Sequence, residues 1–164
     1  MKNLFNLIDS SISLVFIILV FSLSGLTAQT YSANNSSFES TYKRSESIFT
    51  SNSFEFHSYM VFNGSQREKN ASKLVVNNNK ISGQLLPTVS SNSSAITFKG
   101  KRIKNYKIQL DDEFQTIIIV FDTQIEGAKY HFTIKAMPNG KTFLEVNSEL
   151  QENELEYIGN ILRI

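Results

Sequence analysis

The sequence predicts an antiparallel all-β domain, either a sandwich or a partly open barrel of about nine strands. From Phe54 onward, apolar residues recur at every second position over short runs, which is the period of a half-buried strand. Short polar turns rich in Gly, Asn and Ser separate these runs, and no amphipathic run of helix length follows Phe54. Short local turns between strands are typical of antiparallel sheets.

The stretch from Phe114 to Val146 is the clearest part of this pattern, with three β-rich runs and two Gly-containing turns. Asn139-Gly140 is the stronger turn, because Asn and Gly tolerate the positive φ angles of a tight hairpin. The run Phe114–Thr123 is apolar on both faces, so we expect it in the centre of the sheet, covered on both sides. Its faces hold Phe114, Ile118 and Val120 on one side and Ile117, Ile119 and Phe121 on the other.

The other strands and their connections follow from the same alternation and from turn-forming residues. We expect a polar loop at Asn63–Ser72, a second at Thr88–Ser94, a basic turn at Gly100–Arg102 and an acidic turn at Asp111–Glu113. The remaining strands are expected at Phe54–Met60, Leu74–Val76, Ile81–Leu86, Ala95–Lys99, Ile103–Leu110, Ala128–Met137, Lys141–Ser148 and Leu155–Ile161.

Residues 1–28 have the pattern of a secretory signal peptide. Lys2 supplies a weakly basic start, Leu14–Phe21 is an unbroken apolar run, and the small residue Ala28 marks the cleavage site. The apolar run is short for a membrane span, which needs about 20 residues. An uncleaved anchor remains the alternative, because Asp9 lies in the leader and Leu26 is large for its position before the cut.

The rest of the chain is expected to be exported through the inner membrane, into the periplasm or out of the cell. The sequence contains no cysteine, so it forms no disulfide and carries no lipid on a cysteine at the leader junction. The mature chain should therefore not be a lipoprotein, and it should not span the membrane. Residues 29–52 are expected to form a polar linker with a short helix at about Ser36–Ser47, and residues 53–164 the β domain.

The charge balance and the residue pattern exclude several function classes. A net charge of +1 gives no overall indication of a nucleic-acid or anionic-membrane partner. The sequence has no Gly-x-Ser-x-Gly turn and no glycine-rich phosphate loop, and Asp111–Glu113 is interpreted as a solvated turn rather than an acid–base pair. We therefore predict no catalytic residues and no cofactor.

The two histidines, His57 and His131, are the only candidate nitrogen ligands for a metal. Together with Glu55 they would supply three ligands if the strands brought them together. Neither histidine lies in a metal-binding spacing motif, and both are expected at outward-facing strand positions. We interpret them as surface histidines and predict no metal.

A cluster of basic residues forms the candidate binding patch: Lys99, Lys101, Arg102, Lys104 and the neighbouring aromatic Tyr106. Lysines beside an aromatic side chain suit phosphate-bearing glycans, lipid head groups or nucleic acid. The alternative is a turn kept soluble by its charge, since lysines on strand edges also block aggregation.

Several short motifs, in their order and spacing, resemble the domain-of-unknown-function family DUF4251, which consists of exported proteins of Gram-negative envelopes. The similarity runs from about Phe54 to Ile161, and the loop after Pro87 departs from the aromatic, glycine-bearing loop usual in the family. The resemblance implies the fold and export, but it implies no activity. The motifs are Phe54-Glu55-Phe56, Leu85-Leu86-Pro87, Tyr130-His131-Phe132, Asn139-Gly140 followed by Leu144 and Val146, and Tyr157-Ile158-Gly159-Asn160-Ile161.

These observations favour a non-enzymatic domain that binds another envelope component. Its binding surface is expected at the loops Asn63–Ser72 and Thr88–Ser94 or at an exposed strand edge. One alternative is a carrier of a small lipid or glycan, since barrels enclose apolar pockets. An enzyme is the third hypothesis. The partner and the oligomeric state do not follow from the sequence.

We expect the exported protein to begin at or near Gln29, because cleavage follows the small residue Ala28. N-terminal sequencing of protein recovered from the envelope will test this. A chain that still begins at Met1 would support the uncleaved anchor.

Overall fold

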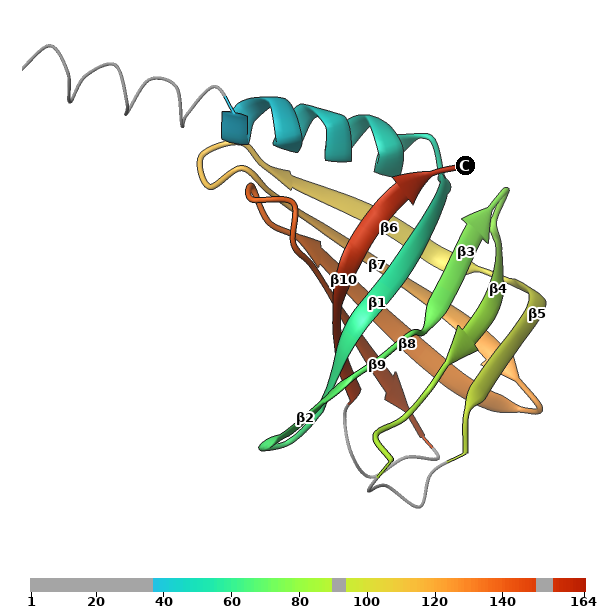
Figure 1. Ribbon diagram of the computed structural model, residues 1–164. Coiled ribbons are helices and arrows are strands. Elements are labelled where there is room, and N and C mark those ends of the chain that lie inside the picture. Colours follow the sequence, from blue (N-terminus) through green and yellow to red (C-terminus); the bar gives the residue numbers. More distant parts are fainter. Residues whose placement is uncertain (1–36, 90–93, 150–154) are drawn as a thin grey trace, which may run out of the picture. The chain divides into compact units, whose positions relative to one another are not determined.

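The structure, a computed structural model, describes residues 37–89, 94–149 and 155–164. In these residues one antiparallel sheet curls into a half-barrel, accompanied by one helix at residues 37–50 (Figure 1). The strands are β1 (Ser53–Asn63), β2 (Gln66–Lys69), β3 (Lys73–Asn77), β4 (Lys80–Leu85), β5 (Ile96–Arg102), β6 (Lys104–Asp111), β7 (Thr116–Ile125), β8 (Ala128–Ala136), β9 (Thr142–Ser148) and β10 (Leu155–Arg163).

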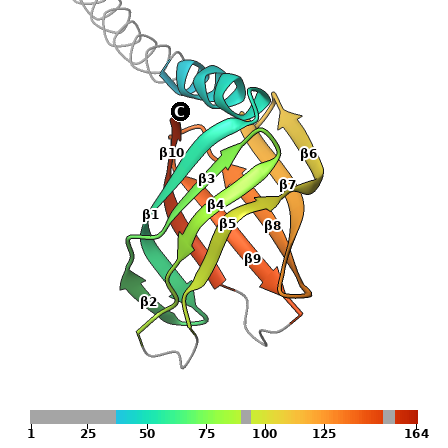
Figure 2. The same cartoon turned by 90° about the vertical axis from the view of Figure 1, so that its right-hand side faces the viewer.

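The strand order explains the shape of the sheet. Neighbouring strands follow the order β5-β4-β3-β1-β10-β9-β8-β7-β6, and each neighbouring pair is antiparallel. The two edge strands are therefore β5 and β6, although Ile103 alone separates them in sequence. The sheet curls until β5 contacts β7 (Figure 2). The all-β prediction is confirmed, and the partly open barrel is the architecture observed.

Aromatic side chains fill the inside of the curl. Buried and non-buried residues alternate along β8, so that one face of this strand packs inward. Phe121 of β7 stacks on Phe132 of β8 with ring centroids 4.7 Å apart. Phe132 also meets Phe98 of β5 edge-on, at 5.4 Å. These rings link one edge of the sheet to strands near the other edge, and burying each contributes about 1.5–3 kcal/mol.

The helix of residues 37–50 packs against the barrel. The hydroxyl of Tyr42 donates a hydrogen bond to Oδ1 of Asp112, in the turn between β6 and β7, at 2.7 Å. The side chains of Ile48 and Phe49 are buried in the same core as the strands. The predicted short helix is confirmed, and it extends beyond its predicted end because these two apolar residues lie on its inner side.

The structure corrects the predicted loop at Asn63–Ser72, because β2 lies within it and pairs with the end of β1. Gly64 forms the turn between the two strands with a φ of 60°. All four residues of β2 are polar or charged, and the strand lies off the main path of the sheet. A polar strand shows no apolar alternation, so the sequence pattern does not reveal it.

The predicted basic turn at Gly100–Arg102 is also wrong, because these residues continue β5. The pairing of β5 with β4 extends to Arg102, which lies opposite Lys80. Gly100 has a φ of 59°, and the pairing shifts register between Ile81 and Gly83. A bulge therefore accommodates the glycine without ending the strand.

The position of β7 differs from its prediction. The strand begins at Thr116, and Phe114 lies in the preceding turn with 67% of its surface exposed. β7 is next to the edge strand β6 instead of central in the sheet. Ile117, facing inward, is fully buried, whereas Ile118 and Val120 on the opposite face are only half-buried. The apolar outer face of β7 is therefore part of the molecular surface.

Three predicted segments lie wholly or partly outside the described residues. They are the signal peptide at residues 1–28, the first part of the linker at residues 29–52, and most of the loop Thr88–Ser94.

We expect Gly159→Ala to destabilise the fold by about 3 kcal/mol, as overpacking does. Gly159 lies in β10 beside β1, where a Cβ atom would collide with the carbonyl oxygen of His57 and lie 2.8 Å from Cε2 of Phe56. Urea unfolding followed by circular dichroism will measure the loss. The control is Gly64→Ala, which places a Cβ in open space at a φ of 60° and should cost about 1 kcal/mol. Equal losses in the two variants would contradict the steric explanation.

Candidate binding groove

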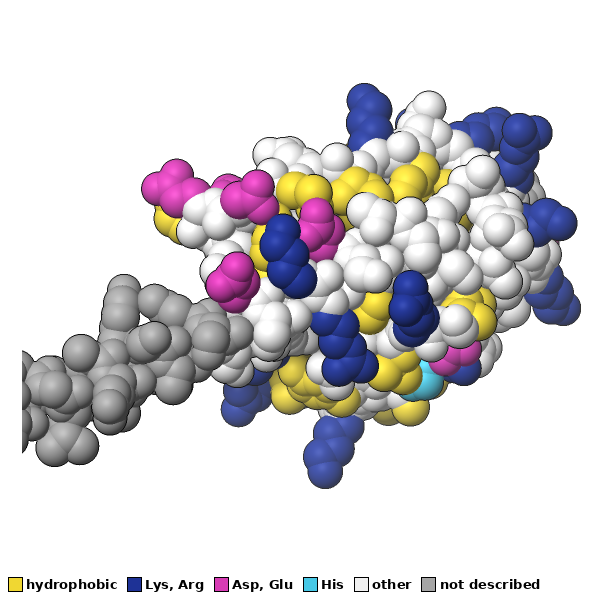
Figure 3. Space-filling view, turned by 90° about the horizontal axis from the view of Figure 1, so that it is seen from above, with side chains coloured by type: hydrophobic (Ala, Val, Ile, Leu, Met, Phe, Trp, Pro, Cys, Tyr) yellow, Lys and Arg dark blue, Asp and Glu magenta, His cyan; other side chains and the backbone are white. Residues whose placement is uncertain are grey.

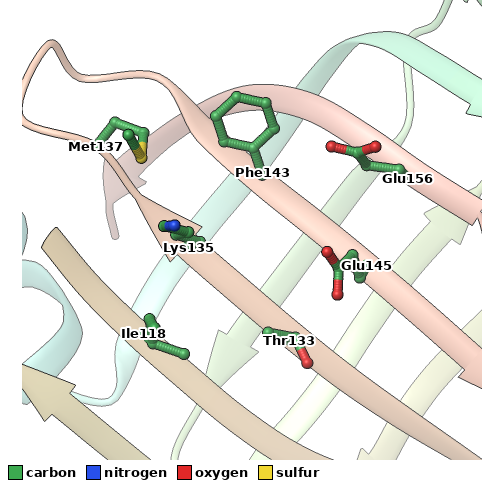
Figure 4. Close-up of a pocket in the computed structure, with 7 residues that line it drawn as sticks. All are labelled: Ile118, Thr133, Lys135, Met137, Phe143, Glu145 and Glu156. Carbon is green, nitrogen blue, oxygen red and sulfur yellow. The ribbon is translucent and has the colours of Figure 1, made fainter.

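A groove of about 350 Å³ crosses the outer face of the sheet over β7, β8, β9 and β10 (Figure 4). It lies on the side of the sheet opposite the core. The seven residues that line it are Ile118, Thr133, Lys135, Met137, Phe143, Glu145 and Glu156.

Strand register brings these residues together. Ile118 lies opposite Lys135, and Lys135 lies opposite Phe143, so that one row crosses three strands. A second row runs through Thr133, Glu145 and Glu156. Residues directly opposite in antiparallel strands share a face, and their chain neighbours point inward to the core. The groove is thus assembled from residues that are distant in sequence.

The apolar part of the groove is unusual for a solvent-facing sheet surface. Outer positions in such sheets are normally polar. Here the side chains of Ile118, Met137 and Phe143 are half-buried and lie along one side of the groove in Figure 4. Concave apolar linings with a few polar groups are typical of ligand sites. The lining therefore suits a ligand with an apolar part.

The polar part of the groove is mainly acidic. Glu145 lies directly opposite Glu156, and both side chains are half-buried. Like charges directly opposite each other destabilise a strand pair, and Lys135 lies opposite Phe143, two residues before Glu145 on β9. A cationic group bound between the carboxylates would lower this repulsion. The groove can therefore hold a ligand that combines an apolar group with a positive charge.

Sequence reasoning did not identify the groove, although one signal pointed to it. The run around Ile118 is apolar on both faces, which we interpreted as a central strand. An apolar outer face on a strand near a sheet edge is equally a sign of a binding surface. Only the strand order distinguishes the two cases.

The predicted basic patch lies where β5 passes into β6, away from the groove. Lys99 and Arg102 are exposed on β5, and Lys104 is exposed at the start of β6. Lys101 is half-buried and lies opposite the core residue Ile81. A second hollow of about 420 Å³ adjoins this patch on the side of β3 and β4, lined by Val75, Asn77, Asn78, Lys80, Ser82 and Gly100.

Tyr106, the aromatic residue of the predicted patch, faces the core. Its ring stacks on Phe121 with centroids 6.0 Å apart, and its hydroxyl donates a hydrogen bond to the carbonyl oxygen of Phe49 at 3.2 Å. Burial raises the pKa of Tyr106 to about 12. The register shift between Lys104 and Lys107 turns this side chain inward. Of the five patch residues, the four basic ones thus contribute to the surface.

His57 lies on the outer face of β1 and pairs with a carboxylate. Its Nε2 lies 2.7 Å from Oε2 of Glu55, and Nζ of Lys73 lies 2.8 Å from the same oxygen. The hydrogen bond from Lys73, followed by that from His57, lowers the pKa of Glu55. This triplet joins β1 to β3.

His131 pairs with the buried carboxylate of Asp122. The Nδ1 atom of His131 lies 2.8 Å from Oδ1 of Asp122, and Nδ2 of Asn105 donates to Oδ2 at 2.7 Å. Nζ of Lys129 lies 3.4 Å from Oδ2. These contacts, with His131 the largest, lower the pKa of Asp122 to about 2. The pair joins β7 to β8 and holds the bulge of β6.

A sequence signal could have revealed the pair of Asp122 and His131. The strands β7 and β8 are joined by the two-residue turn Glu126-Gly127, with φ angles of 51° and 92°. A two-residue hairpin fixes the register of its strands, which places residue 122 opposite residue 131. In the described residues, no group of three His, Cys, Asp or Glu residues is placed to hold a metal ion.

The fold and the groove define the chain as an antiparallel half-barrel with an open surface site. The chain belongs to the DUF4251 family, described as a domain of unknown function, whose pattern matches residues 39–161. Its structure is similar to the crystal structure of a DUF4251 family protein from Bacteroides eggerthii, with a TM-score of 0.64 and 16% identity. The similarity covers 75% of this chain and 87% of that chain. No curated protein matches the sequence.

No helix in the described part of the chain is both long enough and apolar enough to cross a bilayer.

We expect Asp122→Asn to lower the free energy of unfolding by about 2 kcal/mol at neutral pH, the scale of hydrogen bonds to a charged group. The loss should shrink as the pH falls from about 4 towards 2. The folded pKa of Asp122, about 2, lies below the ordinary 3.8, so the wild type loses this stabilisation on acidification. Urea unfolding over a pH series will measure both effects.

The control for this prediction is Glu113→Gln, a change in an exposed turn. It should leave the pH dependence of stability close to that of the wild type. If Asp122→Asn retained the full acid-induced loss, the carboxylate would not be its source.

Proposed function

We propose that the protein is an exported, non-enzymatic binding domain of the bacterial envelope, and that its outer groove receives the partner. The observation that carries this proposal is the half-buried apolar lining of the groove on a face that would otherwise be polar. The leader at residues 1–28 supports export. The partner would present an apolar group beside a positive charge, to match Phe143 and the two glutamates.

The composition of the groove supports binding more than catalysis. Its polar lining consists of Thr133, Lys135, Glu145 and Glu156, and the two histidines lie outside it. Each histidine instead contacts a carboxylate that bridges neighbouring strands. Catalytic sites usually combine a nucleophile, a base and an orienting group in one cleft.

The alternative function, a carrier of a small ligand, has one supporting observation inside the barrel. Among the residues that the structure describes, the hydroxyls of Thr142 and Tyr157 are buried without a hydrogen-bond partner, and burial raises the pKa of Tyr157. The surrounding interior is occupied by aromatic side chains such as Phe121 and Phe132, which stack on each other. This packing favours the groove over the interior as the binding site.

The test is affinity capture with the purified protein as bait and detergent-extracted envelope fractions as the source. We expect Phe143→Ser combined with Glu156→Gln to lower capture of the enriched partner about tenfold, as loss of a central apolar anchor does. Mass spectrometry of proteins and small molecules will identify what is retained.

The matched control combines Tyr59→Ser with Glu113→Gln, which also removes one aromatic ring and one negative charge, but outside the groove. Tyr59 is 41% exposed. Retention of the partner by the groove variant at the level of the control would exclude the groove. A co-purified lipid or glycan that survives the groove substitutions would favour the carrier.

A further inference from the structure

We propose that the outer face of β6, β7 and β8 docks on an anionic lipid surface. The docking surface, termed here the lysine face, consists of lysines on two strands with apolar residues on the strand between them. Its members are Lys104 and Lys107 on β6, Ile118 and Val120 on β7, and Lys129 and Lys135 on β8.

Strand register places these residues on one face. Lys107 lies opposite Val120, and Lys135 lies opposite Ile118. Lys104 lies opposite Asp122. On β8, His131 lies opposite Asp122, and Lys129 precedes His131 by two residues. Directly opposite residues, and residues two apart on a strand, point to the same side. All four lysines are exposed.

The lysine face carries a net positive charge. Asp122 is the carboxylate among these paired positions, and its charge is already met by His131, Asn105 and Lys129. On the outer face of β6, β7 and β8, four lysines thus stand against two aspartates, Asp122 and Asp111, the latter at the end of β6 opposite Thr116. The molecule as a whole has a net charge of only +1. The positive charge of the lysine face therefore comes from an uneven distribution of charged residues over the surface, and not from an excess of basic residues in the sequence. In Figure 3 most of the visible Asp and Glu side chains lie towards one side, with Lys or Arg side chains beside them, and further Lys and Arg side chains project from the rest of this view.

The spacing of the lysines favours an extended array of phosphates over a single anion. β6 and β8 are two strand spacings apart, about 10 Å, and Lys129 and Lys135 are about 20 Å apart along β8. Lysines that bind one phosphate converge on it, whereas these lysines are distributed over a broad face. A lipid surface presents head-group phosphates across such an area simultaneously. The half-buried Ile118 and Val120 lie between the lysines, where they would face the glycerol region.

The lysine face is separate from the proposed function of the groove, although Ile118 and Lys135 contribute to both. Its test therefore uses lysines outside the groove. The purified protein will be sedimented with vesicles of phosphatidylcholine alone and of phosphatidylcholine mixed with phosphatidylglycerol. We expect binding to the anionic vesicles alone, weakened by added sodium chloride.

The test variant is Lys104→Gln, Lys107→Gln and Lys129→Gln together. Each lysine near an anionic surface contributes about fivefold to binding, so the triple variant should bind about 100-fold more weakly. The matched control, Lys43→Gln, Lys69→Gln and Lys141→Gln, removes the same charge from exposed positions elsewhere and should bind within a few-fold of the wild type. Circular dichroism will verify that each variant is folded.

Equal losses in the two triple variants would show that net charge, not the lysine face, governs binding, and would overturn the proposal. Absence of wild-type binding to anionic vesicles would also overturn it. Displacement by inorganic phosphate, but not by sodium chloride of equal ionic strength, would indicate a soluble-anion site instead. The groove variant should bind vesicles normally, so that failure of one proposal is distinguishable from failure of the other.

Discussion

The contact of Phe98 with Phe132 closes the barrel and brings its two sheet edges together. Phe98 belongs to the edge strand β5, whereas Phe132 belongs to β8 near the other edge. Their contact closes the curl, and Ile103, buried at the corner between β5 and β6, fixes the path of the chain there. A hydrogen bond from the hydroxyl of Thr123 to the carbonyl of Arg102 holds this corner against β7. Without closure, the aromatic inner face would be exposed to water.

Closure of the barrel leaves the two faces of the sheet in different environments, one in the core and the other on the molecular surface. The inner face packs into the core, so the outer face, the strand edges and the loops are the surfaces that the barrel presents to its surroundings. On the outer face, the groove and the lysine face adjoin at Ile118 and Lys135. A molecule held on a lipid surface through β6–β8 would bring the acidic side of the groove, with Glu145 and Glu156, close to that surface. Lipid docking would thereby restrict the groove to partners at the membrane.

The charged residues of the outer face also stabilise the curl itself. Asp122 receives contacts from β6 and β8, and Glu55 joins β1 to β3 through His57 and Lys73. Each carboxylate therefore links neighbouring strands on the solvent side, as the aromatic rings do on the inner side. The histidines that looked like metal-ligand candidates act as hydrogen-bond partners in these links. The alternation of side chains along a strand places both histidines on the outer face. The pairing register of the strands decides which residues they contact.

Alternation, turn chemistry and motif order are local properties, so the fold class, the short helix, most of the strands and the family could be predicted from the sequence. The basic cluster was recognised in the sequence, but Lys101 and Arg102 were expected in a turn and lie on β5. The two-residue turn Glu126-Gly127 was enough to set the register of β7 with β8. The position of β7 near an edge, the inward orientation of Tyr106 and the strand conformation of the polar β2 became visible only in the folded structure. Folding also assembled the groove, whose residues come from four strands. The physical reason is that pairing between distant strands depends on closure of the whole sheet, and no local pattern specifies which apolar face the core will cover.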